Sequence, residues 1–277
     1  MTGAVGVRRR YQGRSVTVAP PAPRLIDRGV VAALDRAAAR KVTVVSAPAG
    51  SGKTCLLRAW AGGPGRSHRL ALVQVRRDQH DTQQFWLALL DAIRHATGAH
   101  SDAELPAATP EFNPPAMVDR VLSELADARD GLTLVIDDLH ELSPEAFAPL
   151  TRLLTSLPPQ VHAIVTTRHE VRLRLHQLRL AGELAEIRAT DLRFSERETH
   201  ELLAASGIAL SAAGTALLHQ RSEGWAAGLR LAALSLAGHP DPERFVAEFS
   251  GSDRTVAEYL IAEMLERQPA EIGRAHV

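Results

Sequence analysis

The residues best suited to phosphate chemistry lie in the segment APAGSGKT, residues 47–54. Gly50 and Gly52 allow backbone angles that turn successive N–H groups inward, where they can hold phosphate oxygens. A helix that begins near Lys53 adds the positive end of its dipole. The compact charge of Lys53 also suits the β- and γ-phosphates of a nucleotide better than a planar guanidinium would. Because Lys53 is one of two lysines in a chain with 32 basic residues, a particular geometry is indicated there.

This segment stands in the setting of a Walker A P-loop, which is a strand, a glycine-rich loop and then a helix. Residues 42–46 (VTVVS) predict the strand, and residues 54–61 (TCLLRAWA) predict the helix. A glycine-rich turn without a ligand is the alternative, and this setting disfavours it. Ala47 replaces the first glycine of the motif, at a position that mainly shapes the turn. We expect ATP or ADP to be bound by Pro48, Ala49, Gly50, Ser51, Gly52, Lys53, Thr54 and Cys55, with the Thr54 hydroxyl on Mg²⁺.

Two acids end a second apolar strand, residues 132–137 (LTLVID), in the manner of a Walker B motif. Asp137 is expected to hold the Mg²⁺ shell, and Asp138 to orient or deprotonate the attacking water. Arg168 follows another apolar strand and is expected to contact the γ-phosphate. Aspartate is also common where strands turn, and Arg168 could be an ordinary surface arginine. Structural roles for these residues therefore stay open.

Other residues that could touch a nucleotide are expected to have structural roles. Cys55 is interpreted as a residue that packs its helix near the α-phosphate and not as a nucleophile. His140 and His169 follow the two phosphate-facing strands and are expected to be solvated loop histidines. Three tryptophans in helical patterns are expected in the core: Trp60, Trp86 and Trp225.

The three motifs require a parallel sheet covered by helices, and the rest of the chain predicts one. Strand patterns cover residues 42–46, 70–75, 132–137, 162–167 and 184–188. Helical patterns alternate with them at residues 54–61, 82–97, 115–129 and 144–157. After about residue 194 only helical patterns follow, beginning with the capping box of Ser195 and Glu198. We therefore predict an α/β nucleotide-binding domain followed by an all-helical domain.

Composition excludes several other classes of protein. The formal net charge of the 277 residues is zero, so the chain as a whole has no electrostatic basis for binding nucleic acid. No apolar run approaches the roughly 20 residues needed to cross a bilayer, and the N-terminus lacks the apolar segment of a signal peptide. The single cysteine excludes an internal disulfide and fits a reducing compartment. A cytoplasmic location without membrane contact is expected.

Several blocks together resemble a known family: the P-loop, LVIDDLHEL at 134–142, TTRHE at 166–170, and above all DLRFS at 191–195 with EGWAAGL at 223–229. Over residues of about 23–271, the chain is similar to the MalT-like large ATP-binding LuxR regulators, which are STAND P-loop ATPases. The resemblance implies a five-stranded P-loop NTPase sheet of order 5-1-4-3-2, then a helical domain and a winged-helix domain. The expected division is a flexible leader at 1–23, the nucleotide-binding domain at 24–193, the helical domain at 194–240 and the start of a truncated winged-helix domain at 241–277.

The resemblance also implies a function. The nucleotide state would gate self-association and transcription, an inducer of unknown chemistry would bind a sensor region, and DNA would bind only through a C-terminal domain absent from these residues. Ala226 stands where related ATPases place a proline near the adenine, so no purine contact is assigned to it. The closing EIGRAHV is either a true tail or a translated sequencing adapter. Two other functions stay open: an AAA+-type ATPase acting on nucleic acid or protein, and a nucleotide-binding module without hydrolysis.

Overall fold

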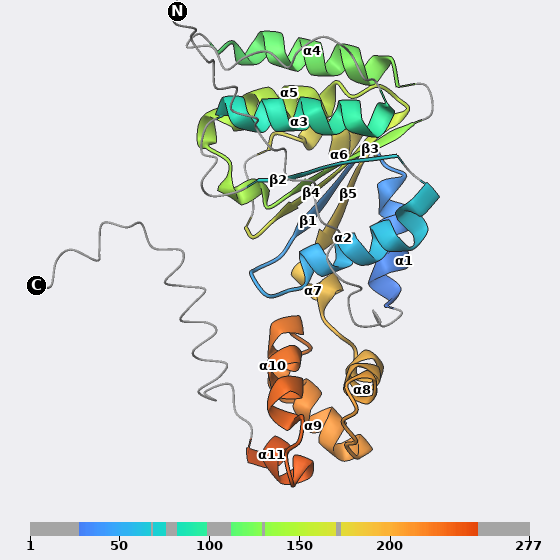
Figure 1. Ribbon diagram of the computed structural model, residues 1–277, viewed down its shortest axis with the longest axis vertical. Coiled ribbons are helices and arrows are strands. Elements are labelled where there is room, and N and C mark those ends of the chain that lie inside the picture. The colour runs from blue at the N-terminus through green and yellow to red at the C-terminus, as the bar shows by residue number, and fades with distance from the viewer. Residues whose placement is uncertain are drawn as a thin grey trace, which may run out of the picture.

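The computed structural model describes residues 28–67, 69–75, 82–98, 112–128, 131–169 and 173–248. Over these residues the chain forms a parallel sheet flanked by helices, with a separate group of helices beside it (Figure 1). The predicted leader at 1–23 and the closing EIGRAHV lie outside the described residues. The predicted winged-helix segment is described only up to residue 248.

The sheet has strands in the order β2-β3-β4-β1-β5, and every neighbouring pair is parallel. Its strands are β1 (Val42–Ser46), β2 (Leu70–Gln74), β3 (Leu132–Asp137), β4 (Val161–Thr167) and β5 (Leu184–Arg188). Every residue of β3 is buried, as its largely apolar run predicts for a central strand. The order confirms the predicted five-stranded P-loop NTPase sheet. The carboxyl ends of all the strands lie along the same edge of the sheet. The P-loop after β1, the two acids at the end of β3 and Arg168 after β4 therefore meet there.

Helices cover both faces of the sheet (Figure 1). One face carries α1 (Gly29–Ala38) and α2 (Lys53–Gly62), followed by the short η1 (Pro64–Ser67). The other carries α3 (Thr82–Thr97), α4 (Pro114–Ala126) and α5 (Phe147–Thr155). Short elements complete this part: η2 (Leu139–Glu141), η3 (Pro144–Ala146), α6 (His176–Leu180) and α7 (Ala189–Leu192). The helix predicted at 144–157 is therefore η3 followed by α5, and α1 has no counterpart among the predicted elements.

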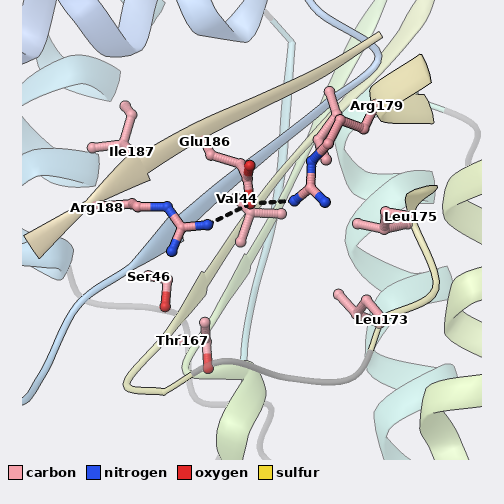
Figure 2. Close-up of a pocket in the computed structure, with 10 residues that line it drawn as sticks. Val44, Ser46, Thr167, Leu173, Leu175, Arg179, Glu186, Ile187 and Arg188 are labelled. Carbon is pink, nitrogen blue, oxygen red and sulfur yellow. Dashed lines mark hydrogen bonds and ion pairs between the residues drawn. The ribbon is translucent and has the colours of Figure 1, made fainter. Parts of the chain in front are cut away.

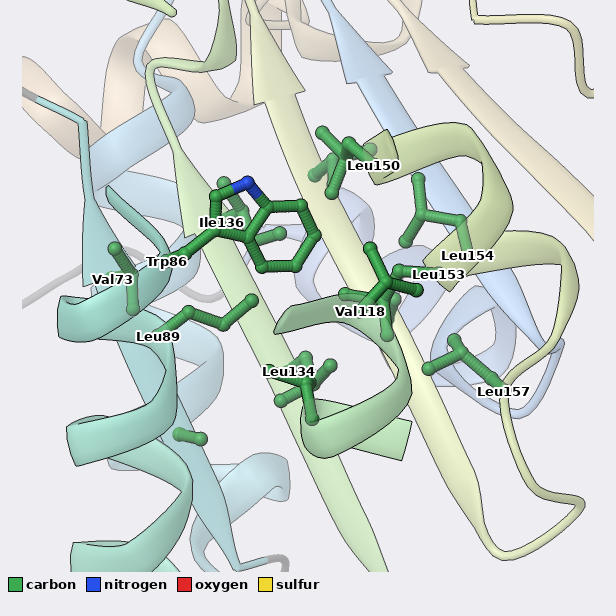
Figure 3. Close-up of a cluster of buried hydrophobic side chains, with 14 of the residues drawn as sticks. Val73, Trp86, Leu89, Val118, Leu134, Ile136, Leu150, Leu153, Leu154 and Leu157 are labelled. Carbon is green, nitrogen blue, oxygen red and sulfur yellow. The ribbon is translucent and has the colours of Figure 1, made fainter. Parts of the chain in front are cut away.

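Two cores fill the space between the sheet and its helices. In the larger one, Trp86 and Leu89 of α3 pack against Leu134 and Ile136 of β3, with α4 and α5 closing the cluster (Figure 3). The smaller core lies under α1 and α2 and includes the fully buried Trp60. The prediction of core positions is confirmed for Trp60 and Trp86. In the part of the chain that the structure describes, no helix is long and apolar enough to span a membrane.

The chain then continues as four helices: α8 (Glu196–Ala205), α9 (Ala212–Ser222), α10 (Ala226–Leu236) and α11 (Pro242–Glu248). The predicted capping box starts α8: the Glu198 amide donates to Ser195 Oγ at 3.2 Å, and the Ser195 amide donates to Glu198 Oε2 at 2.8 Å. These helices share a small core of their own, to which α11 contributes Val246. We call α8–α11 the helical unit.

Candidate nucleotide-binding site

The phosphate loop joins the end of β1 to the start of α2, as the sequence predicts. Gly50 and Gly52 have φ angles of 71° and 86°, in the left-handed region that favours glycine. Gly52 is also the N-cap of α2, so the unpaired N–H groups of the first helical turn face the loop. Both predicted glycines are therefore required by the backbone conformation.

Lys53 is folded back beneath this loop. Its side chain is buried, and Nζ donates to the carbonyl oxygens of Ala47 at 2.6 Å and Pro48 at 3.0 Å. These bonds compensate the burial of the ammonium group and hold it at the mouth of the loop. A fixed cation beside the unpaired backbone N–H groups at the start of α2 has the chemistry of a polyphosphate site.

The predicted metal-binding residues come together although 83 positions separate them in the chain. Thr54 Oγ1 donates to Asp137 Oδ2 at 3.0 Å, and the Thr166 hydroxyl donates to the other oxygen, Oδ1. Among the described residues, no group of three or more His, Cys, Asp or Glu side chains could hold a metal ion. Mg²⁺ often uses only one or two protein oxygens together with substrate phosphates and water. The Thr54–Asp137 pair fits that requirement.

Asp138 leaves the strand in a left-handed conformation, with a φ angle of 59°. Its amide donates to Thr166 Oγ1 at 3.0 Å, and its Oδ2 accepts a long hydrogen bond of 3.4 Å from Gln74 Nε2 at the end of β2. Asp138 is thus turned away from the line of β3 but held at the same edge as Asp137. Arg168 follows β4 at this edge and is half-buried.

Two of the sequence interpretations are wrong. Cys55 is exposed, because it lies on the outer side of the first turn of α2, so it does not pack against the core. His140 is not a solvated loop histidine: only 6% of its side chain is exposed. His140 lies in η2, the turn that directly follows β3, whereas His169 is exposed as expected. A position beside the α-phosphate stays a prediction for Cys55.

The helical unit contacts the phosphate loop, which the sequence interpretation missed. The Ala227 amide donates to the Gly50 carbonyl at 3.0 Å, and Trp225 Nε1 donates to the Ala49 carbonyl at 3.4 Å. A Cβ atom on Gly50 would lie 2.7 Å from the Trp225 ring and 2.8 Å from Ala227 Cβ. Trp225 is thus only partly buried in the core of the helical unit and also lies on the loop. The block EGWAAGL contains Trp225 and Ala227, but the sequence did not indicate that they contact the phosphate loop.

We expect Trp225→Ala to weaken nucleotide binding about tenfold, because the loop loses one hydrogen bond and the ring that packs on Gly50. Trp225→Phe keeps the ring and loses only the N–H donor, so its effect should be smaller. Calorimetry with Mg-ADP measures both. Leu234→Ala is the control, since Leu234 is an exposed residue of the same helix. Equal affinity of Trp225→Ala and the wild type would show that the contact does not stabilise the loop.

A separate pocket of about 250 Å³ lies beside the loop, at the ends of β1, β4 and β5. Figure 2 shows Arg179 and Arg188 both directed at Glu186 on its rim. Glu186 Oε1 accepts from Arg179 at 2.8 Å and from Arg188 at 3.3 Å. Leu173, Leu175 and Leu184 also line the pocket. None of the residues that line this pocket belongs to the P-loop or to the acids that follow β3, so the pocket is not part of the candidate site.

Residues 27–166 match the family model of the AAA ATPase domain. The chain belongs to the AAA ATPase domain family. The matched range contains the P-loop, the Thr54–Asp137 pair and the strand that carries Thr166. The chain is also 31% identical, over 240 residues, to the serine/threonine-protein kinase PknK of Mycobacterium tuberculosis. That alignment covers 84% of this chain but 21% of the kinase, so the chain spans about a fifth of the length of the curated relatives that it matches.

Solved structures share the fold at low sequence identity. The Walker-type ATPase PABY2304 of Pyrococcus abyssi aligns with a TM-score of 0.57 and 15% identity, over 85% of this chain and 73% of that one. The STAND protein PH0952 of Pyrococcus horikoshii, which has a tetratricopeptide repeat sensor, aligns with a TM-score of 0.54 and 16% identity. That alignment covers 91% of this chain and 34% of PH0952. Cdc6p of Pyrobaculum aerophilum aligns with a TM-score of 0.51 and 14% identity, over 79% of this chain and 62% of Cdc6p. These likenesses show a P-loop ATPase fold.

Proposed function

We propose that this AAA ATPase domain binds Mg-ATP and Mg-ADP and acts as a slowly hydrolysing switch. The observation that carries the proposal is the convergence of Lys53, Thr54 and Asp137 at one edge of the sheet, beneath a helical unit that contacts the same loop. Lys53 and the loop amides would bind the phosphates, and Thr54 with Asp137 would hold Mg²⁺. When bound, Mg²⁺ would neutralise charge on the phosphates. Asp138 would act on the attacking water, and Arg168 would contact the γ-phosphate.

A switch needs a second element that responds to the ligand. The hydrogen bonds from Ala227 and Trp225 join the helical unit to carbonyls of the loop whose amides would bind the phosphates. A change in the loop conformation when ATP is exchanged for ADP would therefore move the start of α10. Asp138 supports slow turnover, since motor ATPases usually place a glutamate there, and aspartate is one methylene shorter.

We propose further that the domain is one part of a larger LuxR-type transcriptional regulator. The blocks DLRFS and EGWAAGL support this assignment. In such a protein the inducer would bind a sensor region, DNA would bind through a C-terminal domain, and the nucleotide state would control self-association in the cytoplasm. A regulator linked to a protein kinase is the second candidate, and the identity to PknK favours it.

The proposal is tested by turnover of the purified chain in Mg-ATP, measured alone and with duplex DNA or an unfolded protein. A switch should hydrolyse slowly and at the same rate in all three cases. Strong stimulation by DNA or by the unfolded protein would favour an AAA+-type motor and overturn the switch. Binding of nucleotide without any turnover would indicate a nucleotide-binding module that does not hydrolyse ATP. The coding sequence upstream and downstream of this chain separates the two assignments. A C-terminal DNA-binding domain would support the LuxR-type regulator, and a protein kinase domain would support the kinase-linked one.

A further inference from the structure

A short linker joins the sheet and its covering helices to the helical unit (Figure 1). It consists of residues 193–195, between the end of α7 and the start of α8. The Phe194 amide donates to the Gly224 carbonyl at 2.8 Å, and the Phe194 carbonyl accepts from His219 Nε2 at 2.8 Å. A Cβ atom on Gly224 would lie 2.3 Å from that Phe194 oxygen. The linker is therefore held closely against the turn that leads into Trp225.

Arg28, the N-cap residue of α1, holds the linker from the side of the sheet. Its Nη2 donates to the carbonyl oxygens of Leu192 at 2.8 Å and Arg193 at 3.1 Å. The guanidinium also lies over the Phe194 ring, with Cζ 3.7 Å from the ring centroid. A planar guanidinium suits both contacts, because it can donate in its plane while its face stacks on a ring. One side chain thus joins the start of α1 to the residues at which the chain leaves the sheet.

Glu198 holds Arg28 from the side of the helical unit. Its Oε1 lies 3.5 Å from Arg28 Nε, and its Oε2 accepts from the Ser195 amide in the capping box that begins α8. Only 10% of each of the two paired side chains is exposed. Exposed ion pairs contribute little to stability, but loss of one partner from a pair as buried as this one leaves a charge uncompensated. The pair between Arg28 and Glu198 is therefore a fixed contact between α1 and α8.

The helical unit is attached at this linker and also at the phosphate loop. Gly224 bonds to the linker, and the adjacent Trp225 donates to a carbonyl of the loop, as does the Ala227 amide. The turn that holds the linker therefore also carries the contact with the loop. Hinges are typically a few residues at the ends of elements, and a rotation of the helical unit about residues 193–195 would separate Trp225 from the loop.

We propose that Arg28 is a positioning residue, which holds the linker so that the helical unit stays on the phosphate loop; its effect on nucleotide rests on the binding proposed above. The bonds of Arg28 go to the linker and to Glu198, so it acts on the loop through Trp225 and Ala227. Without Arg28, the helical unit spends part of its time away from the loop. The affinity for nucleotide then falls in proportion to the fraction of molecules that keep the contact.

The double variant Arg28→Gln with Glu198→Gln removes the pair and leaves no unpaired buried charge. Glutamine at position 198 can still complete the capping box of α8. Arg28→Lys is a milder second variant, because it keeps the charge beside Glu198 but loses the planar group that spans the carbonyls and the ring. Arg40→Gln is the matched control: Arg40 follows the other end of α1 and donates to the Gly182 carbonyl, which precedes β5, at 2.8 Å. Thermal unfolding checks that each variant is folded.

The first measurement is the quenching of tryptophan fluorescence by acrylamide, without nucleotide. Trp60 and Trp86 are fully buried, whereas Trp225 is half-buried at the loop, so added quenching reports Trp225. Quenching should rise in the double variant, rise less in Arg28→Lys and stay at the wild-type value in Arg40→Gln. In a Trp225→Phe background the double variant should add none. Wild-type quenching in the double variant, or in Arg28→Lys if the double variant does not fold, would overturn the inference.

The second measurement is the affinity for Mg-ADP, by calorimetry. The double variant should weaken binding by up to about tenfold, as Trp225→Ala does. Because both changes act through one contact, the double variant should weaken binding less than about twofold further in a Trp225→Ala background. Unchanged affinity, or full addition of the two losses, would overturn the inference. A wild-type protein that binds no Mg-ADP would overturn the proposed function, whereas the quenching result alone decides whether Arg28 holds the helical unit on the loop.

Discussion

Replacement of Lys53 is expected to remove most nucleotide binding. Lys53→Met keeps the aliphatic stem but loses the ammonium group that the Ala47 and Pro48 carbonyls hold at the loop. Hydrogen bonds to charged groups contribute about 1.5–3 kcal/mol each, so the loss of two to the phosphates should weaken binding at least about 100-fold. Calorimetric titration with Mg-ATP and Mg-ADP measures the effect.

The other lysine supplies a matched control. Lys41 lies at the opposite end of β1 and pairs with Glu183 at 3.0 Å, so Lys41→Met removes the same charge far from the loop. Its affinity should equal that of the wild type. Thermal unfolding of both variants checks that the buried position beneath the loop tolerates an uncharged thioether. If Lys53→Met folds and binds nucleotide as tightly as Lys41→Met does, the P-loop assignment fails.

The second large effect should separate the two adjacent acids. Asp138→Asn is expected to retain Mg-ATP binding and to lower turnover about 10²- to 10⁴-fold, as loss of a general base typically does. Asparagine tolerates the left-handed backbone of this position, so the variant removes the charge with little strain. Single-turnover hydrolysis measures the loss.

Asp137→Asn should act on binding instead. Its carboxylate accepts hydrogen bonds from the Thr54 and Thr166 hydroxyls, and asparagine would lack the negative charge that would hold Mg²⁺ beside Thr54. The affinity for ATP should therefore fall in the presence of Mg²⁺ and change little in its absence. Glu145→Gln, an exposed acid in η3, is the control for both variants. Wild-type turnover in Asp138→Asn would show that Asp138 is a structural turn residue.

Local pattern was sufficient for the sheet and for the phosphate loop. The run at 132–137 is largely apolar because β3 is buried on both faces, and that requirement is visible in a single strand. Gly50 and Gly52 are visible for a similar reason, since positive φ angles favour glycine whatever surrounds them. The helix α1 was not predicted, although its buried residues Val30, Leu34 and Ala38 follow the spacing of one helix face.

Tertiary structure alone decided where the side chains of Trp225 and His140 lie. A tryptophan in a helical pattern satisfies the rule for a core residue, but the contact with Gly50 depends on how α10 meets a loop 175 residues earlier in the chain. His140 follows a strand that ends at the site, and its surroundings come from the turn itself and from the end of β4. Sequence periodicity reports which side of an element is buried, because that depends on near neighbours. The partner that buries it comes from distant parts of the chain, so only the folded arrangement determines that His140 is enclosed between two carboxylates.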